Sequence, residues 1–437
     1  MILKPKVYII AFEFYPLNTG GSHRPYRMAN FLYEEKMDVE VITQTIESAY
    51  IDESLDELLR KSLFKVTRIP LNKKLSNSQS YYFSIEDDVY KKWHFNLLKY
   101  LHAVLVDETN INIIVSLPPF SVGNLILNIR KRYSKINIIC DFRDAWSQWN
   151  VSPYASWFHY FLTLKKENKV ISTASWILTT SEVTQHDFKE LHPNVPRTKF
   201  VLVTNSFDNY LSLPKIIRYT PKDKFRIGYV GSFYYNPNSH HLMFKKWYQK
   251  RFYQFLQYVP NKEDWKYRSP FFLFQIIQEL IREVPELNKR IEINFVGNYP
   301  DWMNEMIHDF GLDSIVNLMG FMEKNNIEKF QNEQDFLLIT SSKRIGKNDY
   351  SIAGKTFEYL SVMKPILTLV NDGALKELLN MTGCCVMLNP DNVESAKTIL
   401  LDIINNGCEL KPKYNFIDKY LTKNAMKPIL DLIRTEK

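Results

Sequence analysis

Short apolar runs, alternating with helical stretches and ending in glycine or polar loops, recur along this chain in two series. In the first half they lie at 7–14, 38–43, 112–117, 136–140, 176–180 and 200–204. In the second half they lie at 225–230, 291–296, 315–318, 335–340, 365–370 and 384–388. Strands that alternate with helices form parallel β-α-β units with helices on both faces of a sheet. The pattern therefore predicts two successive α/β domains.

The chain of 437 residues is also too long for one ordinary hydrophobic core. A polar stretch at 214–224, with two prolines and several lysines, is the expected linker. We therefore expect an α/β fold of two Rossmann-like domains that face a central cleft, at 1–214 and 225–415. The final stretch, 416–437, is predicted as a helix that crosses back to the first domain.

Composition narrows the class of protein. Apolar residues make up 45% and charged residues 24%, as in globular enzymes. The net charge of +8 suits phosphorylated substrates or an anionic membrane surface, and no basic stripe of the density needed for nucleic acid occurs. Four cysteines without a Cys-x-x-Cys pair favour reduced thiols. We expect a cytoplasmic protein that can contact the inner face of the cell membrane.

An insertion at 236–269 interrupts the second domain and mixes aromatic with basic residues. If this segment is helical, its aromatic residues form one stripe with the basic residues beside it. Such a helix packs on the core, covers the cleft as a lid, or lies on an anionic membrane surface. The segment gives no indication of its own chemistry.

The segment at 354–360, Gly-Lys-Thr-Phe-Glu-Tyr-Leu, carries the clearest chemistry. A helix that begins at Gly354 exposes backbone N–H groups and a partial positive charge at its first turn. Gly354 lets a diphosphate approach closely, and Lys355 adds a full charge. Glu358, three residues later, can accept hydrogen bonds from ribose hydroxyls. The alternative is a surface helix with an ordinary Lys/Glu pair.

A second group of charged residues follows a strand of the first domain. Asp141, Arg143 and Asp144 stand at the carboxyl end of the run 136–140, where ligands bind in open α/β sheets. Arg24, near the start of the first helix, can reach a phosphate or an acidic acceptor. The alternative for the three residues after the strand is a structural salt-bridge cluster.

Four segments in sequence resemble the family-four retaining glycosyltransferases, which have the GT-B fold. They are "FYPLNTGGSHR" (14–24), "CDFRDAW" (140–146), "YVGSFYY" (229–235) and "GKTFEYL" (354–360). The resemblance covers nearly the whole chain. It implies an enzyme that moves a sugar from a nucleotide-diphosphate sugar to a glycan or lipid-linked acceptor, with retention of configuration, in surface polysaccharide biosynthesis. The second domain would bind the donor and the first the acceptor.

The resemblance also assigns residues. Glu358 would hold the ribose and Lys355 would neutralise the diphosphate. The remaining predicted site residues are Gly354, Gly20, Gly21, Gly231, Ser232, Arg344 and Arg143 for donor binding, with Asp141, Asp144 and Arg24 as catalytic candidates. The chain departs from the family at Tyr350, where the first glutamate of a Glu-x7-Glu pattern is usual, and no basic residue follows Gly231-Ser232 closely.

Three absent motifs argue against a nicotinamide dehydrogenase, a P-loop enzyme and a glycosyltransferase of the other major fold, which binds its donor through a metal. There is no Gly-x-Gly-x-x-Gly, no phosphate-binding Gly-x-x-x-x-Gly-Lys-Ser/Thr and no Asp-x-Asp. We therefore expect neither a metal nor a cofactor beyond the donor substrate. Two alternatives stay open: a nucleotide-sugar epimerase of the same fold, and a non-catalytic scaffold in polysaccharide assembly.

Overall fold

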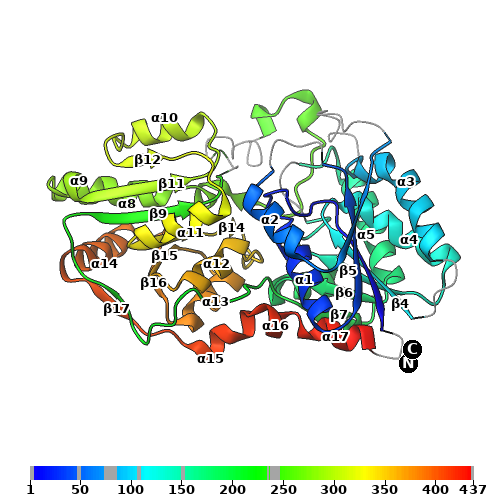
Figure 1. The fold of residues 1–437 in the computed structure, drawn as a ribbon. Coiled ribbons are helices and arrows are strands. Elements are labelled where there is room, and N and C mark those ends of the chain that lie inside the picture. Colours follow the sequence, from blue (N-terminus) through cyan, green and yellow to red (C-terminus); the bar gives the residue numbers. More distant parts are fainter. Residues whose placement is uncertain are drawn as a thin grey trace. The chain divides into compact units, whose positions relative to one another are not determined.

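The computed structural model describes residues 4–46, 51–72, 86–105, 110–148, 153–233, 236 and 247–434. The chain forms two compact units (Figure 1). The first unit comprises 1–206, 246–261 and 422–437, and the second comprises 207–245 and 262–421. The stretch predicted as a linker contains strand β8 (Ile217–Tyr219), which pairs antiparallel with β17 (Cys408–Leu410). It therefore belongs to the second unit.

The first unit is built on a seven-stranded sheet in which all neighbouring strands are parallel. The strand order is β3-β2-β1-β4-β5-β6-β7. The bounds are β1 (Lys6–Ile10), β2 (Asp38–Gln44), β3 (Lys65–Ile69), β4 (Ile111–Leu117), β5 (Asn137–Phe142), β6 (Trp176–Thr179) and β7 (Phe200–Leu202). The order reverses between β1 and β4, as in Rossmann-like folds.

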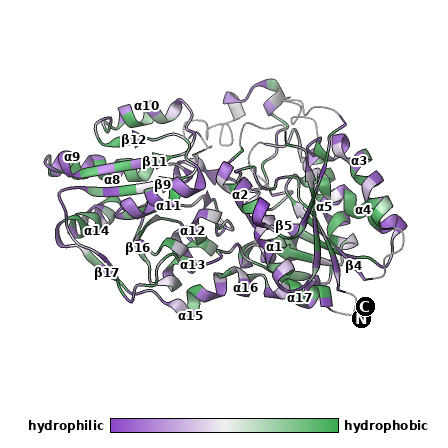
Figure 2. Cartoon of the chain, in the orientation of Figure 1, coloured by the Kyte–Doolittle hydropathy of each residue, from purple (hydrophilic) through white to green (hydrophobic). Residues whose placement is uncertain are grey.

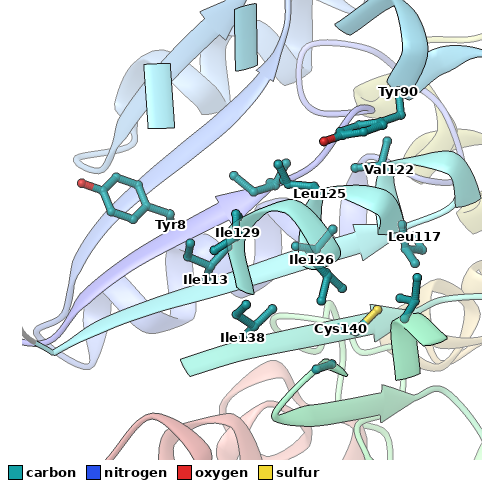
Figure 3. Packing of buried hydrophobic residues seen from close by; sticks show 14 of the residues in the cluster. Tyr8, Tyr90, Ile113, Leu117, Val122, Leu125, Ile126, Ile129, Ile138 and Cys140 are labelled. Carbon is teal, nitrogen blue, oxygen red and sulfur yellow. The ribbon is translucent and has the colours of Figure 1, made fainter. Parts of the chain in front are cut away.

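Side-chain alternation along each strand feeds two cores, one on each face of this sheet. Tyr8 and Ile10 of β1 join one core, with helices α3 (Val89–Val104), α4 (Asn124–Arg132) and α5 (Trp157–Thr173). Figure 3 shows part of it, where α4 lies over β4 and β5. Val7 and Ile9 join the other core, with α1 (His23–Glu34) and α17 (Lys427–Arg434). Helices α2 (Glu53–Lys61) and α6 (Glu182–Leu191) also belong to the unit.

The second unit repeats this plan with six parallel strands in the order β12-β11-β9-β13-β15-β16. The bounds are β9 (Phe225–Val230), β11 (Ile291–Val296), β12 (Val316–Leu318), β13 (Phe336–Thr340), β15 (Ile366–Leu369) and β16 (Cys385–Leu388). One face is covered by α8 (Phe271–Glu283), α10 (Trp302–Asp309) and α14 (Val393–Asn406), and the other by α12 (Gly354–Val362) and α13 (Ala374–Thr382). The unit also contains α9 (Leu287–Arg290), α11 (Lys324–Glu333), α15 (Tyr414–Ile417) and the paired strands β10 (Glu263–Asp264) and β14 (Lys343–Arg344).

The insertion differs from the prediction of a helix in the second domain. Its described part, from 247 onward, contains only the 3₁₀ turns η5 (Trp247–Gln249), η6 (Phe252–Gln254) and η7 (Trp265–Arg268), besides β10. The backbone of Tyr258 exchanges two hydrogen bonds with Tyr154, so it pairs as a strand and cannot continue a helix. Asn261 also donates to Gln148 (2.7 Å). Residues 247–261 therefore pack within the first unit.

The C-terminal stretch is broken into short helices, whereas one helix was predicted. The second unit ends at Leu421, and α16 (Thr422–Ala425) and α17 follow in the first. Pro428 has no N–H to donate and stands at the second position of α17, where that donor is not needed. The Asn137 side chain donates to the Leu432 carbonyl (2.8 Å), which fixes α17 to the start of β5.

Hydropathy follows these layers. In Figure 2 strands such as β4 and β5 are mostly green, whereas the surface helix α11 is mostly purple. None of the helices in the described ranges combines the length and the apolar character needed to cross a lipid bilayer.

Candidate functional site

The strand order of the second unit marks the position of a ligand site. The order reverses between β9 and β13, and in open α/β sheets ligands bind beyond the carboxyl ends of the strands at this point. β9 ends at Val230, so that Gly231 and Ser232 form the first loop at this edge. β13 ends at Thr340 and leads into the loop before α12.

Glycines at this edge permit a close approach of two backbones. Gly231 has a φ of +124°, and its N–H donates to the carbonyl of Val296 at the end of β11 (2.8 Å). A Cβ atom on Gly297 would lie 2.3 Å from the Gly231 carbonyl oxygen, which the Tyr299 hydroxyl also contacts (2.8 Å). Ser232 accepts a hydrogen bond from the backbone N–H of residue 298 (3.2 Å). The first loop is therefore rigidly held from the neighbouring strand.

Helix α12 is anchored to the same edge by its buried face. Phe357 and Leu360 are fully buried, and the Tyr359 hydroxyl accepts a hydrogen bond from the backbone N–H of Val230 (2.9 Å). The helix begins at Gly354, which is exposed and has open space where a side chain would stand. No acidic residue occupies its first turn. The positive end of the α12 dipole is therefore open to an anion.

Lys355 lies at the centre of this arrangement. Its Nζ atom lies 3.6 Å from the ring centroid of Tyr229, and a Cβ atom on Gly231 would approach it to 2.7 Å. Desolvation lowers the pKa of Lys355 to about 7, and the charge of Glu358 opposes this shift only in part. Within the described part of the chain, Nζ makes no hydrogen bond or ion pair. A negatively charged ligand would stabilise the ammonium form in this environment.

The loop before α12 is fixed by a separate set of contacts. Burial raises the pKa of Asp349, whose carboxylate accepts hydrogen bonds from the hydroxyls of Ser342 (2.6 Å) and Ser351 (3.2 Å). Arg344 is buried, lies over the Tyr350 ring (5.0 Å to the centroid) and donates to the carbonyl of residue 348 (3.0 Å). Arg344 thus holds its own loop in place, and its predicted contact with a phosphate stays a prediction.

In the first unit, Arg24 and Asp141 form a buried ion pair. The Asp141 carboxylate is fully buried and accepts from Nε (3.0 Å) and Nη2 (2.7 Å) of Arg24. Nη1 of Arg24 donates to the carbonyl of Thr204 (2.8 Å). The pair connects α1 with the carboxyl ends of β5 and β7. This geometry favours the structural salt bridge over the catalytic alternative for both residues.

The other predicted residues of the first unit lie in two loops, Arg143 and Asp144 after β5 and Gly20 and Gly21 between β1 and α1. Arg143 donates to the carbonyl of Leu117 (3.3 Å) and to that of Pro118. A Cβ atom on Gly21 would clash with the end of the Arg143 side chain (2.1 Å), whereas Gly20 is exposed with open space around it. Asp144 is half-buried, three residues beyond Asp141. Their predicted roles in binding and catalysis stay predictions.

Two tyrosines of the second unit were missed by the sequence analysis. Tyr229 forms the face over which Lys355 lies, and Tyr359 ties α12 to β9. Tyr229 follows Phe225 and Ile227 on the buried face of β9, which is visible in the sequence as period-two alternation. No pattern in the sequence indicated that the Tyr229 ring would contact the Lys355 ammonium.

No protein-family model matches the chain, and no curated protein matches it. Solved structures do match. S. aureus TarM in complex with Fondaparinux, alpha-GlcNAc-glycerol and UDP has a TM-score of 0.60 at 10% identity, over 99% of this chain and 100% of that one. Sucrose-phosphate synthase from Thermosynechococcus elongatus has a TM-score of 0.57 at 11% identity, over 98% and 95%.

A third match is named for a different activity from the first two, although its fold is similar. A Listeria monocytogenes protein assigned as a UDP-N-acetylglucosamine 2-epimerase has a TM-score of 0.50 at 12% identity, over 99% of this chain and 96% of that one. At such identities the likeness shows the fold alone. The chain has the GT-B fold with two Rossmann-like domains, and this prediction is confirmed.

Proposed function

We propose that this protein is a retaining glycosyltransferase of the family-four type. It would transfer a sugar from a nucleotide-diphosphate sugar to a glycan or lipid-linked acceptor, in the assembly of a surface polysaccharide. The assignment of the acceptor side to the first domain and of donor binding to the second is part of this proposal. So are its cytoplasmic location and its peripheral contact with an anionic membrane.

The observation that carries the proposal is the Lys355 ammonium, which makes no hydrogen bond or ion pair within the described part of the chain. It lies against the loop after β9, on the first turn of a helix whose N-terminal end is open. A diphosphate at this end would meet the α12 dipole, the ammonium and the loop of Gly231 and Ser232. Glu358, on the next turn of α12, would accept the hydroxyls of the ribose.

The proposed chemistry follows from charge. As the bond between the sugar and the diphosphate oxygen breaks, negative charge grows on the leaving diphosphate and positive charge on the sugar ring. Lys355 and the first-turn amides of α12 would stabilise the leaving diphosphate, and this electrostatic contribution is about 2.7–4 kcal/mol for one donor in comparable sites. We include transfer without a bound metal in the proposal. Retention of configuration comes from the family resemblance.

Titration calorimetry with UDP, GDP and ADP and their sugars tests the proposal directly. We expect one nucleotide series to bind and its sugar to be transferred, or slowly hydrolysed without an acceptor. NMR of the anomeric proton then gives the configuration of the product. A protein that binds none of these nucleotides with measurable heat is not a glycosyltransferase.

Two other functions are distinguished by the same experiments. An epimerase, which the similarity to the Listeria protein keeps open, would convert the nucleotide sugar or release the nucleotide without any acceptor. A non-catalytic scaffold is favoured by Tyr350, because a buried tyrosine stands where the family has a carboxylate. The scaffold would bind no nucleoside diphosphate.

A further inference from the structure

Five large apolar side chains are exposed near one backbone bridge of the first unit. They are Trp157 (56% exposed), Phe158 (58%), Phe252 (94%), Phe255 (51%) and Leu256 (74%), and we call them the bridge patch. Isolated apolar residues are common on protein surfaces, whereas several exposed apolar side chains close together are typical of an interaction site. None of these residues belongs to the candidate site in the second unit.

The bridge patch is held together by the pairing of Tyr154 with Tyr258. Their backbones exchange two hydrogen bonds (2.9 and 3.0 Å), and the Tyr258 ring lies 4.8 Å from that of Tyr160. Trp157 and Phe255 are each three residues from the bridge, so their Cα atoms lie within about 11 Å of it. Two separate segments of the chain thus bring apolar side chains to one corner of the unit.

Further hydrogen bonds hold the described residues of this corner. The turn that carries Phe252 is closed by reciprocal hydrogen bonds between Arg251 and Gln254 (2.8 and 2.9 Å). Asn261 and Gln148 are both buried and fix the end of the segment. The apolar side chains are therefore presented to solvent by an ordered scaffold, at little further cost in conformational entropy when they bind.

The charge around the bridge patch is mainly positive. Residues 236–262 contain five lysines and arginines and no aspartate or glutamate. On α5, Lys165 and Lys169 are exposed, whereas Glu167 is buried and bound by His192 (2.8 Å). Lys166 is paired with Glu86 (2.5 Å), and Asp144 is half-buried. The corner therefore offers apolar groups within a mainly cationic rim.

We propose that the bridge patch inserts into an anionic lipid surface, with Lys250 and Arg251 against the headgroups. The bridge patch favours lipid over a sugar platform, because Leu256 is 74% exposed and leucine has no ring that could stack on a sugar. Each cation near an anionic surface contributes roughly fivefold to binding. The inference deepens the proposed function, since it places the enzyme where lipid-linked acceptors occur.

Flotation of the full chain with vesicles tests this surface without any nucleotide. We expect binding to vesicles of phosphatidylcholine and phosphatidylglycerol in equal parts, and at least tenfold weaker binding to phosphatidylcholine alone. The triple variant Phe252→Ser, Phe255→Ser, Leu256→Ser should lose at least tenfold in binding. Leu63→Ser is the matched control, because Leu63 is 77% exposed elsewhere in the first unit, and it should bind like the wild type.

A second variant and a spectroscopic signal separate insertion from misfolding. Replacing Lys250 and Arg251 with glutamate should abolish the preference for phosphatidylglycerol while the thermal midpoint stays unchanged. Trp157 should be quenched by brominated lipid, and the Trp157→Phe variant should lose that part of the quenching.

Three results would overturn the inference: no vesicle binding, equal binding by the triple variant, or quenching of Trp157 by oligosaccharide and not by lipid. Nucleotide affinity is measured in parallel on the same proteins. It should be unchanged in every variant, because the bridge patch lies in the first unit. If the wild type binds vesicles but no nucleotide, the proposed function fails and the lipid surface stands.

Discussion

Titration of Lys355 makes donor binding depend on pH in a specific way. If only the ammonium form binds the diphosphate, affinity follows the protonated fraction of Lys355, whose pKa is about 7. That fraction falls from about nine tenths at pH 6 to about one tenth at pH 8, so affinity falls about tenfold, or about 1.4 kcal/mol. A nucleotide sugar is the right ligand, because its phosphates carry constant charge over this range, whereas the terminal phosphate of a free diphosphate titrates near pH 6.

Calorimetry with the matching nucleotide sugar between pH 6 and pH 8 measures this slope. Lys355→Met should bind weakly and without pH dependence, and should lose about 10²–10³ in kcat. Lys347→Met, which removes an exposed lysine from the loop before α12, should keep the slope of the wild type. A wild-type affinity that is constant over this range would refute the assignment of Lys355 to the diphosphate.

The same pKa has a consequence for stability in the absence of ligand. A lysine with a lowered pKa in the folded state binds fewer protons there than in the unfolded chain, where its pKa is about 10.4. The unfolding free energy should therefore rise with pH from about 7 to about 10, by at most about 1.4 kcal/mol per pH unit from this group. Denaturant titrations should show this rise in the wild type and its loss in Lys355→Met. An equal rise in both proteins would assign it to other groups.

Three further substitutions separate binding from structure. Glu358→Gln should weaken donor binding by about 1.5–3 kcal/mol, the cost of losing hydrogen bonds to a charged group, with an unchanged thermal midpoint; calorimetry and a thermal melt check both. Gly231→Ala should cost about 1–3 kcal/mol of stability because of its positive φ, and should also displace Lys355, so both measurements should change. Arg24→Ala should destabilise the first unit by about 3–5 kcal/mol, because it leaves Asp141 buried without its partner. If Arg24→Ala kept full stability but lost turnover, the catalytic alternative for Arg24 would be right.

The parallel strands could be predicted because both faces of each sheet are covered. Each buried strand is then an apolar run, such as 225–230, which the structure reproduces as β9. The strands that were missed carry weaker patterns. β3 alternates polar and apolar residues at the edge of the sheet, and β8 pairs over only three residues. β10 and β14 have two residues each and lie far apart in the sequence, so their pairing depends on the tertiary fold.

The described part of the insertion, from 247 onward, contradicts the helix prediction for a related reason. Its aromatic residues have helical spacing, but tertiary pairing of Tyr258 with Tyr154 overrides that local preference. Pro260 adds a position without a donor two residues later. No motif between 236 and 269 indicates that this segment pairs with residues of the first domain. The contact between these distant segments therefore could not be predicted from the sequence.

For the predicted site residues, too, the sequence indicates their positions near strand ends but does not indicate their tertiary contacts. The predicted cations of the two units look alike in the sequence, since Arg24, Arg143, Arg344 and Lys355 all follow or face strand ends. The fold separates them by what each already contacts. The guanidinium groups are bound to carbonyl oxygens of their own chain, with a carboxylate added for Arg24 (Asp141) and for Arg143 (Glu13, 3.8 Å). Lys355 lies on an aromatic face, which attracts a cation but satisfies none of its hydrogen bonds. A ligand that supplies oxygen acceptors gains most at Lys355, and for that reason we place the diphosphate there.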